Sequence, residues 1–220
     1  MTHPNDALAR LFDAQPVNDL PQGDRYNICP TQSVAVVVQG AQAAQGAGPR
    51  VLTHKRWGFV PHWYKQPNDG PLLINARSET IAQKPAFAQA CRTSRCLIPA
   101  SGFYEWTKDA SGHRLPWYIT RRDGGVMVFA GVWQDWGAGD ARISTCAIVT
   151  TQANCATQQI HHRLPVILGP DDWALWLGEQ GKGAARLMQP CAPDVLQFHR
   201  VDAAVNSNKA TGAQLIEKIV

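Results

Sequence analysis

The chain has 220 residues, a mass of 24.1 kDa and a formal net charge of +4. Its residues are 45% hydrophobic and 17% charged, which is typical of a folded globular domain and excludes collagen-like and disordered chains. No apolar run approaches the roughly 18 residues of a membrane span, and the N-terminus lacks the pattern of a secretory signal. We therefore expect a cytoplasmic protein with a single domain over residues 1–220 and no membrane partner.

The predicted elements begin with a helix at 5–14, where Asn5 is the expected N-cap and Leu8, Leu11 and Phe12 share one face. The segments 40–49 and 136–142 are rich in glycine and indicate surface loops. Apolar and alternating runs predict strands at 33–39, 51–59, 71–76, 95–100, 102–108, 115–120, 126–133, 143–150 and 164–168.

Further helices are expected at 78–90, 170–177 and 210–219. Strands outnumber helices and do not alternate with them, which predicts an α+β domain and argues against a doubly wound sheet. We expect one compact domain in which a mainly antiparallel or mixed, partly barrel-like sheet is flanked by a few short helices.

The basic residues are concentrated in one stretch of the sequence. Residues 50–122 contain twelve Lys or Arg and four Asp or Glu, so this stretch carries +8 and the remainder carries −4. Ten of the eighteen aromatic residues lie in the same stretch. Cations and rings together suit the phosphates and bases of single-stranded nucleic acid. A β-rich core with a solvated basic rim has the same composition, and composition alone favours that second interpretation.

Six cysteines, at 29, 91, 96, 146, 155 and 191, form no C-x-x-C motif. This spacing does not suggest a zinc site, and we expect reduced thiols that are mostly small core residues. The common dinucleotide, phosphate-loop and zinc-protease signatures are also absent from the sequence. We therefore expect no metal and no organic cofactor.

The first candidate site is Asn75 with Arg77, where an apolar strand is expected to end and a helix to begin. Backbone N–H groups at a helix N-terminus favour anions, so these residues suit a phosphate and sugar clamp. Capping of orphan amides is the alternative role for Asn75 and Ser78.

The second candidate is Glu105 in the aromatic run Gly102–Trp106. Strand alternation places Phe103, Glu105 and Thr107 on one face. A carboxyl group beside Phe103 would be partly desolvated, which raises its pKa as in a general acid or base. An exposed glutamate, or one paired with an arginine, is equally compatible with the sequence.

The third candidate is His161, which with His162 and Arg163 precedes an apolar strand. Histidine is the commonest proton-transfer group near neutral pH. Adjacent residues are expected to point apart, so the pair does not suggest a shared metal. A lone histidine is more often structural than catalytic.

In order along the chain, these segments resemble the SOS response-associated peptidase (SRAP) family. The resemblance spans about 190 residues and is carried by RYNICPTQ (25–32), RWGFVPHW (56–63), INARSET (74–80), SGFYEW (101–106), AIVTTQAN (147–154), IHHRLPVIL (160–168) and AAVNSNKATGAQLI (203–216). The family shields abasic sites in single-stranded DNA through a covalent link, which implies such DNA as the partner of a monomeric, nucleoid-associated protein.

The resemblance also implies roles for single residues. Asn75 would orient the linking group and the opened sugar, Glu105 would transfer protons for the linkage, and His161 would assist opening of the deoxyribose. The DNA-binding positions implied by the family pattern are Arg77 as a phosphate contact, Arg163 beside the DNA, and Trp63 and Thr150 along the DNA groove.

The sequence departs from the family pattern at its beginning. SRAP proteins begin Met-Cys-Gly-Arg, and the cysteine, exposed once the protein removes its own initiator methionine, is the nucleophile. This chain begins Met1-Thr2-His3-Pro4, and its first cysteine is Cys29. We expect that the arm belongs before Met1 in the intact protein and that Cys29 does not replace the nucleophile.

Three other functions stay open at this point. A thiol peptidase acting on other proteins would need a reactive cysteine near His161, and the sequence singles none out. A non-enzymatic module that binds single-stranded DNA would need only the stretch 50–122. A glycosidase would need a second carboxylate beside Glu105.

Overall fold

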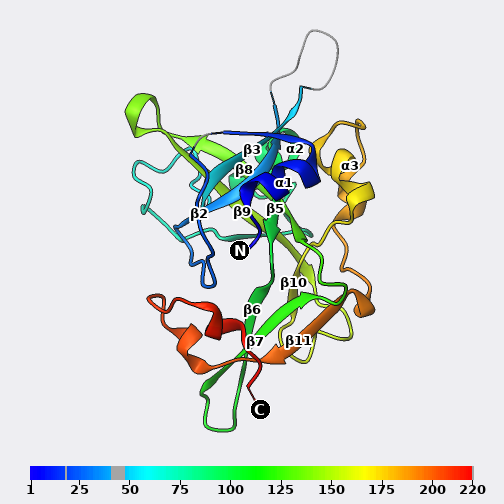
Figure 1. Cartoon of the computed structure of the whole chain (residues 1–220). Coiled ribbons are helices and arrows are strands. Elements are labelled where there is room, and N and C mark those ends of the chain that lie inside the picture. Colours follow the sequence, from blue (N-terminus) through cyan, green and yellow to red (C-terminus); the bar gives the residue numbers. More distant parts are fainter. Residues whose placement is uncertain (18, 41–47, 220) are drawn as a thin grey trace.

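The computed structural model describes residues 1–17, 19–40 and 48–219 (Figure 1). Most of the loop expected at 40–49 lies outside these residues.

Five strands form a closed ring, in the order β3–β2–β5–β8–β9. A parallel pairing of β3 with β9 closes it, and the other pairs in the ring are antiparallel. The ring strands are β2 (Ser33–Gln39), β3 (Arg50–Trp57), β5 (Arg95–Ala100), β8 (Met127–Trp136) and β9 (Ile143–Gln152).

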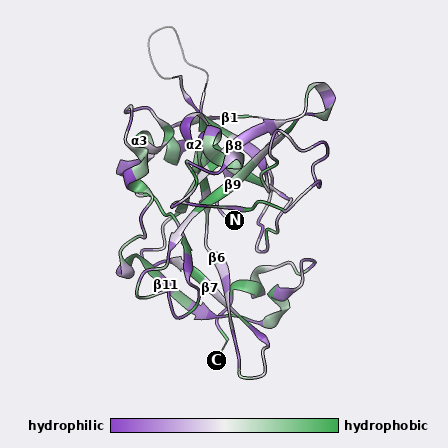
Figure 2. Cartoon of the chain, turned by 180° about the vertical axis from the view of Figure 1, so that it is seen from behind, coloured by the Kyte–Doolittle hydropathy of each residue, from purple (hydrophilic) through white to green (hydrophobic). Residues whose placement is uncertain are grey.

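Three short strands extend the ring sheet: β1 (Ala14–Pro16), β4 (Asn75–Arg77) and β10 (Arg163–Pro165). β1 pairs with β3, and both β4 and β10 pair with β9. The expected α+β fold with a mixed, partly barrel-like sheet is therefore confirmed. Figure 2 shows hydrophobic residues along β8 and β9, as expected for strands buried on both faces.

The helices α1 (Asn5–Phe12), α2 (Pro85–Thr93) and α3 (Trp173–Leu177) pack on one face of the ring strands. A ring of five strands has room inside only for side chains, so the helix-covered face is the outer one. Phe12 and Trp173 meet there with ring centroids 4.6 Å apart. Trp176 is fully buried, and its indole N–H donates to the carbonyl oxygen of Cys96 at 2.9 Å. None of the helices in the described part of the chain is long and apolar enough to cross a membrane.

The inner face of the ring is mainly apolar but includes a lysine. Lys55 on β3 is 5% exposed, and its ammonium group lies 3.7 Å from the ring centroid of Trp133 on β8. Burial lowers the pKa of Lys55, and the nearby carboxylate of Asp135 opposes this shift. Cys96 and Cys146 are buried on this face, and Cys91 and Cys191 are half-buried against the core. All six cysteines are free thiols, so the expectation of reduced, mostly core cysteines is confirmed.

A second, smaller sheet has the order β11–β7–β6. Its strands are β6 (Phe103–Lys108), β7 (Arg114–Arg121) and β11 (Leu196–Arg200). Phe103 joins it to the ring, since its ring lies edge-on against Phe129 of β8 at 5.8 Å. Tyr104, on the opposite face of β6, packs on Tyr118 in a separate small core. Figure 1 shows the N-terminus between the two sheets.

Short 3-10 helices complete the described structure, at Gly139–Ala141, Pro170–Asp172, Ala184–Leu187, Pro193–Val195, Ala203–Asn206 and Ala213–Ile216. The helix expected at 210–219 is limited to the last of these, and Gly212 before it has φ 102°. The helix expected at 78–90 begins only at Pro85. A proline disfavours helical backbone angles at the residue before it, and Lys84 is accordingly extended. Sequence patterns missed β1 and β11, and only the end of the strand expected at 71–76 forms, as β4.

Helix α1 confirms the first predicted element but not all of its details. Pro4 holds the N-cap position, and the Asn5 side chain instead donates to the carbonyl oxygen of Pro21 at 3.0 Å. Leu8 and Phe12 are buried, whereas Leu11 is 45% exposed, so the predicted common face was wrong for Leu11.

Leu8→Ala should therefore destabilise the protein by about 2–5 kcal/mol, because it leaves a cavity between α1 and the ring. Leu11→Ala on the same helix should change the free energy of unfolding by less than about 0.5 kcal/mol. Urea denaturation of both variants measures the difference. Equal losses would show that the helix does not dock as described.

Candidate active site

Strand β9 supports one side of the candidate site. Its C-terminal half lies between β4 and β10, with Arg77 opposite Thr150 and Arg163 opposite Gln152. Because side chains alternate along strands, Asn75 and Arg77 point to the same side of β4, while Ala76 between them is buried in the outer core. This sheet edge therefore presents a row of polar side chains.

Asn75 and Arg77 are both exposed. Within the described residues, neither side chain has a hydrogen-bond or ion-pair partner. The expected helix N-terminus is not present here, since residues 78–84 form turns and α2 begins seven residues later. Any anion at Arg77 would therefore be bound by the guanidinium group and not by a helix terminus.

Glu105 approaches the site from the small sheet. It shares a face of β6 with Phe103, as the alternation predicted, and its side chain is 24% exposed. Burial raises the pKa of Glu105, while the nearby His161 opposes this shift. Within the described residues its ion-pair partner is a histidine, so it is neither the exposed glutamate nor the arginine-paired glutamate of the alternative interpretation.

His161 lies at the end of a turn that spans residues 154–162. Its Nδ1 atom is 3.6 Å from Glu105 Oε1. The backbone of Arg163 offers both an N–H donor and a carbonyl acceptor to the same nitrogen, each at 3.2 Å. Nδ1 can therefore accept a hydrogen bond when neutral and donate one when protonated, which suits a group that takes up and releases a proton.

The neighbouring His162 is exposed and does not point away from His161. The two rings pack with centroids 4.4 Å apart and an interplanar angle of 42°. The expectation that the side chains diverge assumed a strand, and it was wrong because the segment is a turn. The two histidines form no metal cluster: within residues 1–17, 19–40 and 48–219, no group of three His, Cys, Asp or Glu side chains could hold an ion.

Arg163 makes the strongest ion pair of the site. Its guanidinium group donates to both carboxylate oxygens of Glu79, at 2.8 and 2.9 Å, and to the carbonyl oxygen of Thr150 at 2.7 Å. Thr150 itself is only 6% exposed. Glu79 was not predicted from the sequence, although it belongs to the INARSET segment that carries the resemblance.

Trp63 lies apart from these residues, on the loop between β3 and β4. Its side chain is among the few exposed large apolar groups and packs edge-on against His62 at 5.0 Å. Within the described residues the structure records no contact of Trp63 with Asn75, Glu105 or His161.

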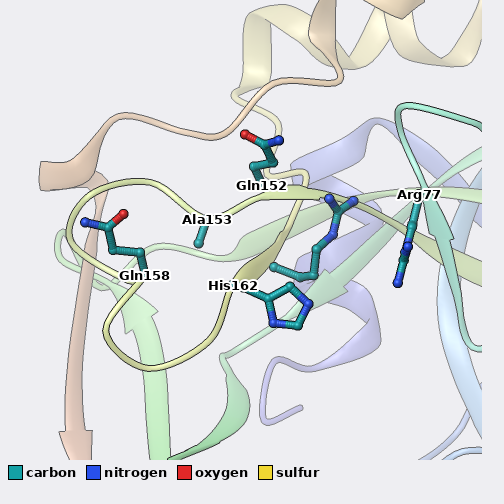
Figure 3. A pocket seen from close by; sticks show the side chains of 6 residues that line it. Arg77, Gln152, Ala153, Gln158 and His162 are labelled. Atoms are coloured by element: carbon teal, nitrogen blue, oxygen red, sulfur yellow. The ribbon is translucent and has the colours of Figure 1, made fainter.

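A shallow pocket of about 600 Å³ opens beside this group. Figure 3 shows His162 in its middle, with Ala153 and Gln158 on one side and Arg77 on the other. The six residues that line it are Arg77, Gln152, Ala153, Gln158, His162 and Arg163. Of the residues predicted from the sequence, the structure thus brings Arg77, Thr150, His161, Arg163 and Glu105 into one contiguous region.

This fold and site define the class of the protein. The chain matches the family described as SOS response associated peptidase (SRAP) over residues 1–208, and it belongs to this family.

Its relatives carry a common functional name. The chain is 33% identical over 205 residues to abasic site processing protein YoqW of Bacillus subtilis, with 90% of this chain and 89% of YoqW covered. It is 34% identical to abasic site processing protein YoaM of the same organism, with 90% and 87% covered. A crystal structure from Bordetella bronchiseptica shares the fold, with a TM-score of 0.75 at 24% identity over 90% of this chain and 96% of that one.

The Glu79–Arg163 pair makes stability depend on pH. The hydrogen bonds from Arg163 lower the pKa of Glu79 from 4.5 to about 2. The pair therefore stabilises the fold above about pH 4.5, and this contribution is lost as the pH falls toward 2. Glu79→Gln should lower the free energy of unfolding at pH 7 and reduce its decline between pH 5 and pH 3, as measured by urea denaturation.

Asp6→Asn is the matched control, because it breaks the Arg10–Asp6 pair, whose side chains are 74% and 66% exposed. An ion pair exposed to this extent contributes little. If both variants lose the same stability, the Glu79–Arg163 pair is no more than an exposed surface pair.

Proposed function

We propose that this protein binds single-stranded DNA at abasic sites and that Asn75, Glu105 and His161 carry the chemistry of a covalent link to the opened sugar. The observation that supports this most is the Glu105–His161 pair, in which a partly buried carboxyl group lies 3.6 Å from an imidazole. Two groups that exchange protons, next to an unpaired arginine and an exposed amide, suit a reaction on an anionic sugar-phosphate.

The proposed reaction starts from the aldehyde of the ring-opened abasic deoxyribose. An α-amine adds to the aldehyde carbon and water leaves, which gives an imine. A thiol of the same residue then adds its sulfur to the imine carbon and its proton passes to the nitrogen, which closes a thiazolidine. His161 would move the proton that opens the sugar ring, Glu105 would move protons during the condensation, and Asn75 would orient the sugar.

The amine and thiol must belong to one residue, which is the N-terminal cysteine of the Met-Cys-Gly-Arg arm in the family pattern. The hydroxyl group of Thr2 lies 3.0 Å from that of Ser101, four residues before Glu105. An arm joined there would start between the two sheets (Figure 1).

The DNA would follow the polar edge of β4, β9 and β10. Arg77 would bind a phosphate, and Arg163, held by Glu79, would lie beside the strand. Thr150 is nearly buried, so its main contribution to the groove would be to position Arg163, whose guanidinium group donates to the Thr150 carbonyl oxygen. Trp63 is exposed enough for a base to stack on its ring.

The test is a denaturing-gel and intact-mass assay with an oligonucleotide that contains one abasic site. It compares this chain with the same chain extended to begin Met-Cys-Gly-Arg-Phe. The proposal predicts an adduct only for the extended chain. Equal adduct formation by both chains would place the nucleophile elsewhere, and no adduct with either would leave a binding protein without the linkage.

Glu105→Gln in the extended chain should slow adduct formation by at least about 100-fold, because general acid–base catalysis contributes roughly 10²–10⁴. Binding of the same DNA should stay near normal, since the amide keeps the size of the side chain. Single-turnover gel kinetics and fluorescence anisotropy measure the two effects. An unchanged rate would remove Glu105 from the mechanism.

Arg77→Ala should weaken binding to a similar extent for all DNA sequences and reduce the salt slope of log K by about 1, as expected for one phosphate contact. Anisotropy titrations at several salt concentrations measure this slope. Arg10→Ala, on the exposed face of α1, is the control for simple loss of a charge. An identical effect of both substitutions would rule out a specific phosphate contact at Arg77.

A further inference from the structure

The pocket beside the candidate site contains polar groups that the proposed reaction does not use. Gln152, Gln158 and His162 are all exposed and line it together. Within the described residues, neither glutamine side chain has a hydrogen-bond partner. The pocket therefore presents two free amides and one aromatic ring together with the side chains of Arg77 and Arg163.

The turn that presents these groups is held in place by a buried amide. Asn154 is 8% exposed, and its Oδ1 accepts hydrogen bonds from the backbone N–H groups of Ala156 and Thr157 at 3.1 and 3.0 Å. Its Nδ2 donates to the carbonyl oxygen of Cys191 at 3.1 Å. The base of the turn is closed by a hydrogen bond from Ala153 N–H to the carbonyl oxygen of His162 at 3.1 Å. The pocket is therefore preorganised, which lowers the entropic cost of binding a ligand there.

A single contact between two histidine rings connects the pocket to the groups proposed to react. His162 lines the pocket and packs on His161 at 4.4 Å, and His161 in turn lies 3.6 Å from Glu105. A DNA strand whose abasic sugar lies at Glu105 and His161 would thus bring its adjacent nucleotide toward the pocket. Arg77, which lines the same pocket, would bind a phosphate of this strand.

We infer that this pocket binds the base of a nucleotide next to the abasic site and that it prefers adenine. The inference rests on the proposed function, and it adds a sequence preference to it. A volume of about 600 Å³ is within the range of pockets that hold small organic ligands. A glutamine amide offers one donor and one acceptor side by side, which matches N7 and N6 of adenine, and His162 offers a face for stacking.

The experiment measures binding of fluorescent single-stranded oligonucleotides that carry a stable abasic analogue and differ only in the base on its 5′ or 3′ side. Anisotropy gives the affinity for A, G, C and T at each position. We expect adenine to bind at least about fivefold more tightly than the other bases on one side of the abasic site, the lower end of discrimination by one bidentate pair. The double substitution Gln152→Ala and Gln158→Ala should abolish this preference while binding to the strand persists.

Gln159→Ala is the matched control, because Gln159 is exposed in the same turn but its side chain donates to the carbonyl oxygen of Ala156 and does not line the pocket. It should keep the preference. Equal affinity for all four bases, or a preference that survives the double substitution, would overturn the inference but leave the proposed function intact. Absence of binding to any abasic strand would overturn both. Since all three glutamines are exposed, thermal unfolding of the variants should match that of the unsubstituted chain.

Discussion

The structure depends on the pairing of β9, which forms hydrogen bonds with four other strands. Its N-terminal half closes the ring between β3 and β8, and its C-terminal half continues past the ring to hold β4 and β10. The same strand thus completes the core and carries the residues that face the proposed DNA. Backbone hydrogen bonds on both edges leave β9 little freedom to shift its register, so the backbone positions of the polar residues beside it are fixed by the same pairing as the core.

The Glu105–His161 pair has a different origin, because its two members come from separate parts of the fold. Glu105 belongs to the small sheet, and His161 belongs to the turn that leads into β10. Packing of Phe103 on Phe129 joins the small sheet to the ring and places the carboxyl group where burial raises its pKa. The site therefore forms only when the two sheets are docked.

Much of this arrangement could be predicted from the sequence, because it depends on local patterns. Alternation along residues 102–108 gave the correct face for Glu105, and the apolar runs located seven strands closely. The sequence could not predict that Glu79 binds Arg163, since 84 residues separate them and many other pairings of opposite charge were equally possible. The stacking of His161 on His162 was missed because it depends on a turn. The late start of α2 could have been foreseen from Pro85, which the helical pattern of the residues around it obscured.

The lysine inside the ring has a practical consequence. The other six lysines, at 65, 84, 108, 182, 209 and 218, are exposed, whereas Lys55 is covered by Trp133 and the ring strands. An amine-reactive reagent would modify the six at once and reach Lys55 only when the strands separate. The acylation rate of this one side chain, followed by mass spectrometry, would therefore report the free energy of opening the ring in the folded protein. The Lys55 ammonium group lies 3.7 Å from the ring centroid of Trp133, so the fluorescence of this tryptophan would change when the ring strands separate and would report the same opening.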